Sequence, residues 1–192
     1  MTQDDLVAAL DPVAKALDEL SVPWHIGGSV ASSAFGIPRT TMDVDLVADL
    51  RHEQALPLCR LLAGRFYAEP ELLRMAIATH SSVNFIHLDT AFKVDVFAVK
   101  QTSYDITAFV RQRLDRIEGI ERLLPFATPE DVVLHKLRWF RAGGEVSERQ
   151  WQDVLGVLRV QRGQLALDYM SHWAQGIGVA DLLARALQEA AG

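Results

Sequence analysis

Cysteine is nearly absent from this chain of 192 residues, in which Cys59 is the single example. One cysteine excludes an internal disulfide and is typical of a reducing compartment. No uncharged stretch is long and apolar enough to span a bilayer, and the first residues, MTQDDLVAAL, are acidic and unlike a secretory signal. We therefore expect a cytoplasmic protein without a membrane partner.

Positive charge is also scarce. The chain carries 19 lysine and arginine residues against 25 aspartate and glutamate residues, a formal net charge of −6. Generic DNA binding depends on many contacts between basic side chains and phosphates, so this charge argues against it. With 49% hydrophobic and 23% charged residues, the composition is that of a globular protein with a substantial core.

The most informative stretch is residues 26–47, IGGSVASSAFGIPRTTMDVDLV. An apolar run ends at Ile26, and Gly27 and Gly28 lack the Cβ atoms that would hold a bound group away from the backbone. We expect Ser29 to be the N-cap of a short helix. Because a helix N-terminus offers free N–H groups and the positive end of a dipole, this turn predicts a phosphate site.

Acidic residues follow in strand-like surroundings. Asp43 and Asp45 alternate with apolar residues, so they share one face, and Cα atoms about 6.6 Å apart let both carboxylates reach one cation. Asp95 lies in a later apolar strand, where a carboxylate is costly unless it is paired or metal-bound. Three converging carboxylates would repel one another, and Mg²⁺ would relieve this. A solvated strand edge is the alternative explanation for Asp43 and Asp45.

The remaining pattern predicts an α+β fold, with a mixed sheet flanked by helices in a domain of residues 1–127. Its expected helices cover residues 3–20, with a break at Asp11-Pro12, and residues 51–63, 70–78 and 104–113. Its expected strands include residues 24–26, 42–47, 66–67, 83–87 and 92–99. From residue 128 the pattern is helical, which predicts a C-terminal helical bundle in a second domain of residues 128–192.

These motifs resemble the nucleotidyltransferase superfamily related to DNA polymerase β. The resemblance is carried by Gly27-Gly28-Ser29, by Asp43-Val44-Asp45 after thirteen intervening residues, and by Asp95 on a later strand. The stretch RTTMDVDL at 39–46, with TPED at 128–131 and a lysine at 136, looks most like the AbiEii-type branch. That branch holds many small bacterial proteins, some of them toxins of toxin–antitoxin systems.

The resemblance implies transfer of a nucleoside monophosphate from an NTP such as ATP to an acceptor hydroxyl, with release of pyrophosphate. The acceptor would be a tRNA, a protein or a small molecule, and a cognate antitoxin is a further implied partner. In this interpretation the backbone and hydroxyl groups at positions 27–29 hold phosphates. Asp43 and Asp45 bind Mg²⁺, while Asp95 completes a second Mg²⁺ site and acts as general base.

Three further residues are candidates for nucleotide binding. Arg39 and Thr41 lie in the loop before the acids, where Arg39 could contact phosphate or pair with an acidic neighbour. Lys136 could reach a triphosphate oxygen, as the corresponding lysine does in AbiEii-type proteins, or it could be a solvated lysine. Arg149 and Asp153 are four positions apart on an expected helix and most simply form an ion pair.

The alternative function is a non-catalytic module of the same fold that binds a nucleotide or a partner protein. The other conspicuous side chains favour neither function. We expect the histidines to be structural and Cys59 to be buried and inert. The aromatic residues of the helical half are expected to pack between its helices: Trp139, Phe140, Trp151 and Trp173.

Overall fold

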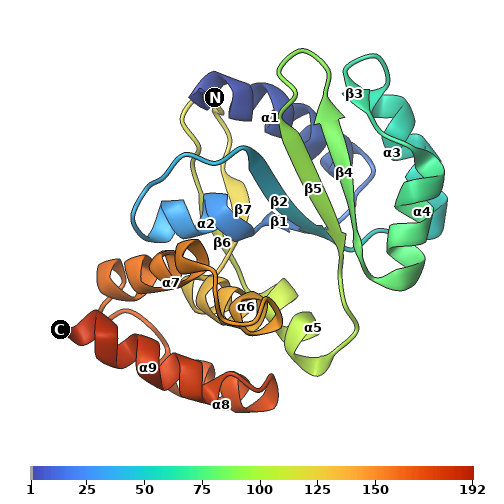
Figure 1. Ribbon diagram of the computed structural model, residues 1–192. Coiled ribbons are helices and arrows are strands. Elements are labelled where there is room, and N and C mark those ends of the chain that lie inside the picture. The colour runs from blue at the N-terminus through green and yellow to red at the C-terminus, as the bar shows by residue number, and fades with distance from the viewer. Residues whose placement is uncertain (1) are drawn as a thin grey trace. The chain divides into compact units, whose positions relative to one another are not determined.

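The computed structural model describes residues 2–192, which divide into two compact units (Figure 1). The first unit consists of the chain up to Ile26 together with Thr40–Phe126. The second consists of Gly27–Arg39 together with Ala127–Gly192. The domain division expected after residue 127 stays a prediction. The segment Gly27–Arg39, which contains the glycine turn and a short helix, belongs to the same unit as the C-terminal helices.

The first unit is built on one mixed sheet. Its strands, as far as residues 2–192 show, lie in the order β3 (Phe66–Tyr67), β4 (Ser82–His87), β5 (Lys93–Ala98), β2 (Asp43–Ala48), β1 (Trp24–Ile26), β7 (Leu124–Ala127) and β6 (Gln112–Asp115). β2 runs parallel to β5, and β1 runs parallel to β7. The pairs β1–β2, β3–β4 and β4–β5 are antiparallel. The expected α+β class is therefore confirmed.

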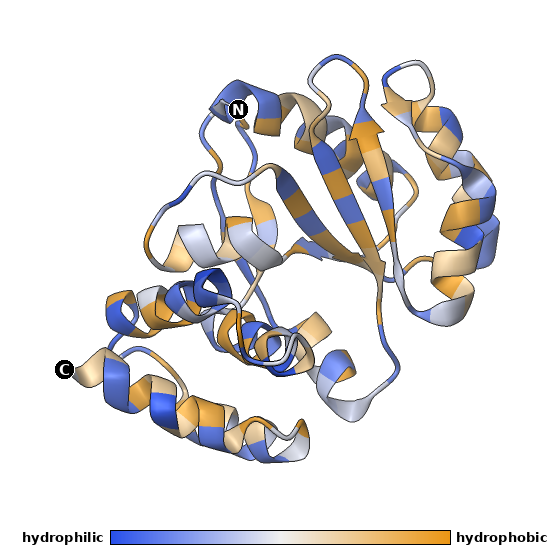
Figure 2. Cartoon of the chain, viewed as in Figure 1, coloured by the Kyte–Doolittle hydropathy of each residue, from blue (hydrophilic) through white to orange (hydrophobic). Residues whose placement is uncertain are grey.

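The two faces of this sheet differ, because apolar and polar residues alternate along its strands. Figure 2 shows the alternation as bands of two colours along β2, β4 and β5. One face buries the alternate apolar residues Val44, Leu46, Val94 and Val96. Helices α1 (Gln3–Glu19) and α4 (Pro70–Thr79) pack on these strands, and α3 (Ala55–Leu62), after a short 3₁₀ turn at His52–Gln54, packs against both helices. The opposite face carries the acidic residues of β2 and β5.

Helix α1 is continuous, so the break expected at Asp11-Pro12 is wrong. Thr2 caps the helix with its side chain, and Pro12 lies in the interior. A proline inside a helix removes one backbone hydrogen bond and costs about 3 kcal/mol. The helix continues because its buried face extends on both sides of the proline, through Ala9, Leu10, Val13 and Leu17.

The second unit is helical. It contains α2 (Gly28–Phe35), α6 (Pro129–Ala142), α7 (Glu148–Val160), α8 (Leu167–Gly176) and α9 (Ala180–Ala191). Helix α2 packs on α6 and α7, and α7 also packs on α9. Thr128 and Ser147 cap α6 and α7, and each side chain accepts a hydrogen bond from the first turn of its helix. The C-terminal helices thus form the expected bundle, and α2 is part of it.

A contact between glycines joins the end of α2 to α7. A Cβ atom on Gly36 would lie 2.8 Å from the backbone nitrogen of Val157, closer than real side chains approach. A Cβ atom on Gly156 would lie 3.2 Å from the backbone nitrogen of Ile37. Glycine at both positions therefore lets the backbone after α2 lie directly on α7. Gln161 adds a hydrogen bond from its Nε2 to the carbonyl of the last residue of α2, at 2.9 Å.

Two further expectations concern side-chain burial. Phe140 and Trp151 are buried as expected, but Trp139 is 53% exposed, so its expected core position is wrong. Trp139 falls between the buried positions of α6 and points away from its packed face. Within residues 2–192, no helix combines the length and the apolar character needed to cross a membrane.

Candidate active site

Asp43, Asp45 and Asp95 lie on the polar face of the first unit's sheet. In the parallel pairing of β2 with β5, Asp45 is the direct neighbour of Asp95, and Asp43 is the neighbour of Lys93. Directly paired residues point to the same side of a sheet, so the three carboxylates share one face. Asp43, Asp45 and Asp95 thus lie on one face of the sheet, as the prediction of a shared site needs. The chemical roles of these acids stay predictions.

The charges on this face act on Asp95. Partial burial of its carboxyl, together with the nearby charge of Asp43, raises the pKa of Asp95 above its ordinary value. The ammonium group of Lys93 offsets part of this effect. The ionised form of Asp95 is thus disfavoured, and a cation bound beside it would favour ionisation.

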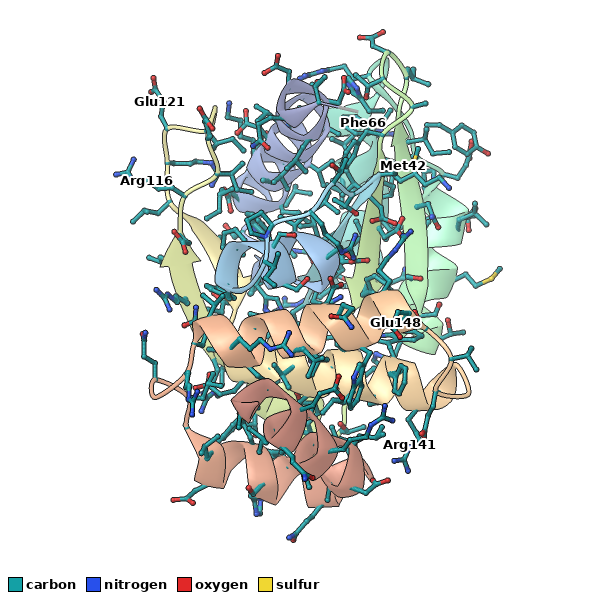
Figure 3. All side chains as sticks on the ribbon, turned by 60° about the vertical axis from the view of Figure 1, so that its left-hand side comes forward. Met42, Phe66, Arg116, Glu121, Arg141 and Glu148 are labelled. Atoms are coloured by element: carbon teal, nitrogen blue, oxygen red, sulfur yellow. The ribbon has the colours of Figure 1, made fainter. Side chains whose placement is uncertain are left out.

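Neutral side chains already hold one oxygen of two of these acids. The Thr41 hydroxyl donates a hydrogen bond to Oδ1 of Asp43 at 2.7 Å. The side-chain amide of Asn84 donates from Nδ2 to Oδ1 of Asp95 at 2.8 Å. Thr41, predicted to bind nucleotide, therefore contacts one of the acids. The next residue, Met42, is labelled in Figure 3 next to the start of β2, and its side chain is 68% exposed.

No group of three or more His, Cys, Asp or Glu side chains in residues 2–192 is arranged as a ready-made metal site. Mg²⁺ is commonly held by only one or two carboxylates and completes its octahedron with phosphate oxygens and water. The acidic face offers hard oxygen donors of the kind that Mg²⁺ prefers, and these donors repel one another. In donor type and charge they fit such an ion.

The glycine turn begins the second unit. Gly27 is the N-cap of α2 and Gly28 its first residue, so the expectation that Ser29 is the N-cap is wrong. Gly28 has a φ of 53°, in the left-handed region that favours glycine. With the cap position filled by backbone, the Ser29 hydroxyl is available for another contact. The first N–H groups of α2 have no carbonyl one turn earlier in the helix, as at any helix N-terminus.

The Ser29 hydroxyl belongs to a charged network that Asp153 organises. Arg39 donates from Nη2 to Oγ of Ser29 at 2.5 Å, and binds both oxygens of Asp153 at 2.7 and 2.8 Å. Lys136 donates from Nζ to Asp153 at 2.7 Å. Within residues 2–192 the ionic partners of Asp153 are therefore Arg39 and Lys136, and the expected helical pair with Arg149 is wrong.

Lys136 and Asp153 are buried in this network, and Arg39 is partly buried. Only 5% of Lys136 is exposed, so the solvated-lysine alternative is wrong. Burial opposes ionisation of Asp153, but hydrogen bonds and charges from Arg39 and Lys136 outweigh it and lower the pKa of Asp153 below its ordinary value. Arg39 and Lys136 bring two cationic groups to Asp153 near the N-terminus of α2, where free N–H groups suit an anion.

Sequence reasoning missed two residues of these arrangements. Asn84 is one of them. If the expected strands 83–87 and 92–99 form a hairpin, position 87 pairs with position 92, and counting outward pairs position 84 with position 95, as the structure shows. Asp153 was interpreted as part of a local ion pair. Its actual partners come from 114 and 17 residues away, so no local spacing could have identified them.

The remaining polar candidates do not add to the chemistry. His25 lies on the acid-bearing face as the neighbour of Val47, and burial lowers its pKa to about 4. Its ring packs against that of Phe109 at 5.3 Å, so it is a neutral structural histidine, as expected. Cys59 is buried, and burial, with the nearby Glu69 charge, raises its pKa to about 11. A thiol of that pKa is inert at neutral pH.

Comparison with known proteins adds the fold. No protein-family model matches the sequence, and no curated protein matches it significantly. The solution structure of the antibiotic-resistance factor ANT(2'')-Ia is similar over 96% of this chain and 98% of its own, with a TM-score of 0.56 and 14% identity. The crystal structure of ANT(2'')-Ia in complex with adenylyl-2''-tobramycin gives 90% and 97% coverage, a TM-score of 0.52 and 13% identity.

A third similar structure is an antigenic nucleotidyltransferase-like protein from Paracoccidioides brasiliensis. It covers 97% of this chain and 92% of its own, with a TM-score of 0.53 and 17% identity. Identities this low bear on the fold alone. The chain has an α+β nucleotidyltransferase-like fold, with a mixed sheet and C-terminal helices.

Proposed function

We propose that this protein is an Mg²⁺-dependent nucleotidyltransferase that moves a nucleoside monophosphate from an NTP to an acceptor hydroxyl. One observation carries the proposal. Asp45 and Asp95 are direct neighbours on adjacent parallel strands, and Asp43 lies on the same face, in a nucleotidyltransferase-like fold. Carboxylates gathered on one sheet face supply the hard oxygen donors that a divalent cation prefers.

In this proposal the acidic face holds the metal. Asp43 and Asp45 bind one Mg²⁺, and Asp95 joins them in binding a second. When bound, the ions supply positive charge to the oxygens of the reacting phosphate and so stabilise the transition state. The proposal is supported by the raised pKa of Asp95, which partial burial and then the charge of Asp43 cause, because a bound divalent cation would favour the ionised carboxylate.

The second unit supplies the groups that hold the triphosphate. The backbone N–H groups at Gly27 and Gly28 and the hydroxyl of Ser29 bind phosphate oxygens, while Arg39 and Lys136 balance their charge. The position of Arg39 and Lys136 in one network with the Ser29 hydroxyl supports this assignment. Arg39 lies only four positions before Asp43 in the sequence, which links the phosphate groups to the acidic strand through a short loop.

The reaction then proceeds by in-line displacement. The acceptor oxygen forms a bond with the α-phosphorus, and the bond from this phosphorus to the oxygen that bridges to the β-phosphate breaks. Pyrophosphate leaves with that oxygen and the bonding electron pair. The proton of the acceptor hydroxyl passes to the carboxylate of Asp95 and from there to solvent.

The finer identity follows the resemblance of RTTMDVDL at 39–46 and of Lys136 to the AbiEii-type branch. On that basis we propose a cytoplasmic enzyme whose acceptor is a tRNA, a protein or a small molecule, and a cognate antitoxin is a candidate partner. The buried position of Lys136 in a charged network supports a role beyond that of a surface lysine.

The test is incubation of the purified chain with each α-³²P-labelled NTP and Mg²⁺, in the presence of total tRNA, a protein extract or an aminoglycoside. We expect label in one acceptor fraction and release of pyrophosphate. The variant Asp95→Asn should abolish labelling, and Asp89→Asn, which changes an exposed acid in the β4–β5 turn, should not.

The alternative is a nucleotide- or partner-binding module of the same fold. It predicts NTP binding by calorimetry without turnover in any acceptor fraction, and binding that persists in Asp95→Asn. That pair of results would replace the proposed enzyme with this module.

A further inference from the structure

Asn84 stands beside the proposed general base. It lies on β4, in direct antiparallel register with Asp95 on β5. Its Nδ2 donates a hydrogen bond of 2.8 Å to Oδ1 of Asp95, a distance typical of a strong hydrogen bond to a carboxylate. The side chain of Asn84 is exposed, so its amide is not placed by core packing. The contact with Asp95 is what orders it.

The register of three strands places Asp95 between unlike neighbours. On the β2 side its direct neighbour is Asp45, a second carboxylate. On the β4 side its direct neighbour is Asn84, a hydrogen-bond donor. The donor on the β4 side holds one oxygen of Asp95 in place.

We propose that Asn84 is a positioning residue for Asp95, an inference that rests on the proposed nucleotidyl transfer. The amide occupies Oδ1 of Asp95 and fixes the plane of the carboxylate. Oδ2 is then the oxygen that receives the acceptor proton. Reacting groups must be held near their productive geometry, and partners that orient a ligand or a base typically contribute 10–100-fold in metal affinity or activity.

The chemistry of the amide is specific at this position. Leucine has a similar volume but no donor, so it would leave the Asp95 carboxylate free to rotate. Aspartate has the same shape but adds a fourth negative charge to the face and cannot donate when ionised. Glutamine keeps the donor on a chain longer by one methylene, which moves the amide out of register with Asp95.

The experiment compares Asn84→Leu with a matched control on the same strand face. Ser82 is exposed, lies two residues earlier on β4 and pairs with Phe97, which is not an acid. In Asn84→Leu we expect kcat for NMP transfer to fall about 10–100-fold, with KM for the NTP and the melting temperature unchanged. Ser82→Ala should match the wild-type protein in all three.

A second readout does not depend on turnover. Binding of Mn²⁺ in the presence of a non-hydrolysable NTP, followed by electron paramagnetic resonance, should weaken about 10-fold or more in Asn84→Leu and stay unchanged in Ser82→Ala. An active wild-type protein whose kcat and Mn²⁺ affinity survive Asn84→Leu would overturn the inference and leave the proposed function intact.

The two proposals fail in different ways. A wild-type protein that binds Mn²⁺ but transfers nothing would refute the proposed reaction, and weaker Mn²⁺ binding in Asn84→Leu would still support the positioning role. A wild-type protein that neither transfers nor binds Mn²⁺ refutes both.

Discussion

Asp95 in the first unit is a partly buried carboxylate and Asp153 in the second is a buried one, and their surroundings shift their pKa values in opposite directions. Partial burial and the charge of Asp43 raise the pKa of Asp95, although Lys93 offsets part of this effect. Asp153 is bound by Arg39 and Lys136, and its pKa is lowered. The ionised form is therefore disfavoured at Asp95 and favoured at Asp153.

The difference indicates what each region would bind. A face of like-charged acids gains free energy when a cation arrives, so it is suited to a metal ion that comes and goes with substrate. A carboxylate bound by two cationic side chains keeps its charge without a ligand.

The largest expected effect tests the acidic face. Asp43→Asn and Asp45→Asn should each lower NMP transfer about 10³-fold or more, because bound metal contributes several kcal/mol to the transition state. Initial rates with saturating NTP and Mg²⁺ measure the loss. Asp89→Asn is the matched control, since it removes an exposed acid from the same unit. Equal rates in all the variants would show that the face takes no part in the reaction.

The next effect tests the helical network. Asp153→Ala should destabilise the protein by about 3–5 kcal/mol, because it removes the ionic partner of the buried Lys136 and one ionic partner of Arg39. Urea unfolding measures the change in the free energy of unfolding. Asp181→Asn, which removes the exposed carboxylate bound by Arg141 (labelled in Figure 3), should have little effect. A similar small loss in both variants would mean that the network contributes no more than a surface pair.

A smaller effect of opposite sign is expected for Asp95. Without metal, Asp95→Asn should stabilise the protein by less than about 1 kcal/mol, since it removes one of the repelling charges from a partly exposed face. Mg²⁺ with a non-hydrolysable NTP should raise the melting temperature of the wild-type protein by linkage, and do so less in the variant. Thermal denaturation with and without ligand measures both. A clear loss of metal-free stability would instead identify Asp95 as a structural hydrogen-bonding partner.

The smallest effect is the pH dependence of stability, where the two acids should act in opposite directions. The folded-state pKa of Asp95 is raised, so its contribution makes stability fall as pH rises from about 3.8 through that raised value. The folded-state pKa of Asp153 is lowered, so its stabilisation is present above about 3.8 and is lost as pH falls below that value. Urea unfolding across pH 3–7 for the wild type, Asp95→Asn and Asp153→Asn separates the two. Parallel curves for the two variants would contradict the comparison.

The fold class and the shared face of Asp43 and Asp45 could be predicted from the sequence, because both depend on the local alternation of apolar and polar residues. Alternation identified β2 and β5, and the two-residue spacing of Asp43 and Asp45 placed both on one face. The neighbourhood of Asp45 and Asp95 was a hypothesis, since it depends on which strands become adjacent in the sheet. Local spacing cannot give that order.

The charged network shows the limit more clearly. Arg149 lies four positions before Asp153, and side chains at this spacing on a helix are close enough to form an ion pair, so this pair was predicted. Arg39 and Lys136 bind Asp153 instead, in a buried setting where each unpaired charge would be costly. Likewise, helix α1 passes through Pro12 because long-range burial of its apolar face outweighs a local penalty. In both cases a contact distant in the sequence overrides a local preference.

The glycine contact between α2 and α7 has a consequence for that network. Gly36 and Gly156 set the spacing between the loop that carries Arg39 and the helix that carries Asp153. A single added methyl group at either glycine would push the loop outward and pull the guanidinium away from its carboxylate. Alanine at these two positions would thus behave as an electrostatic mutation, although it changes no charge and lies outside the proposed reaction centre.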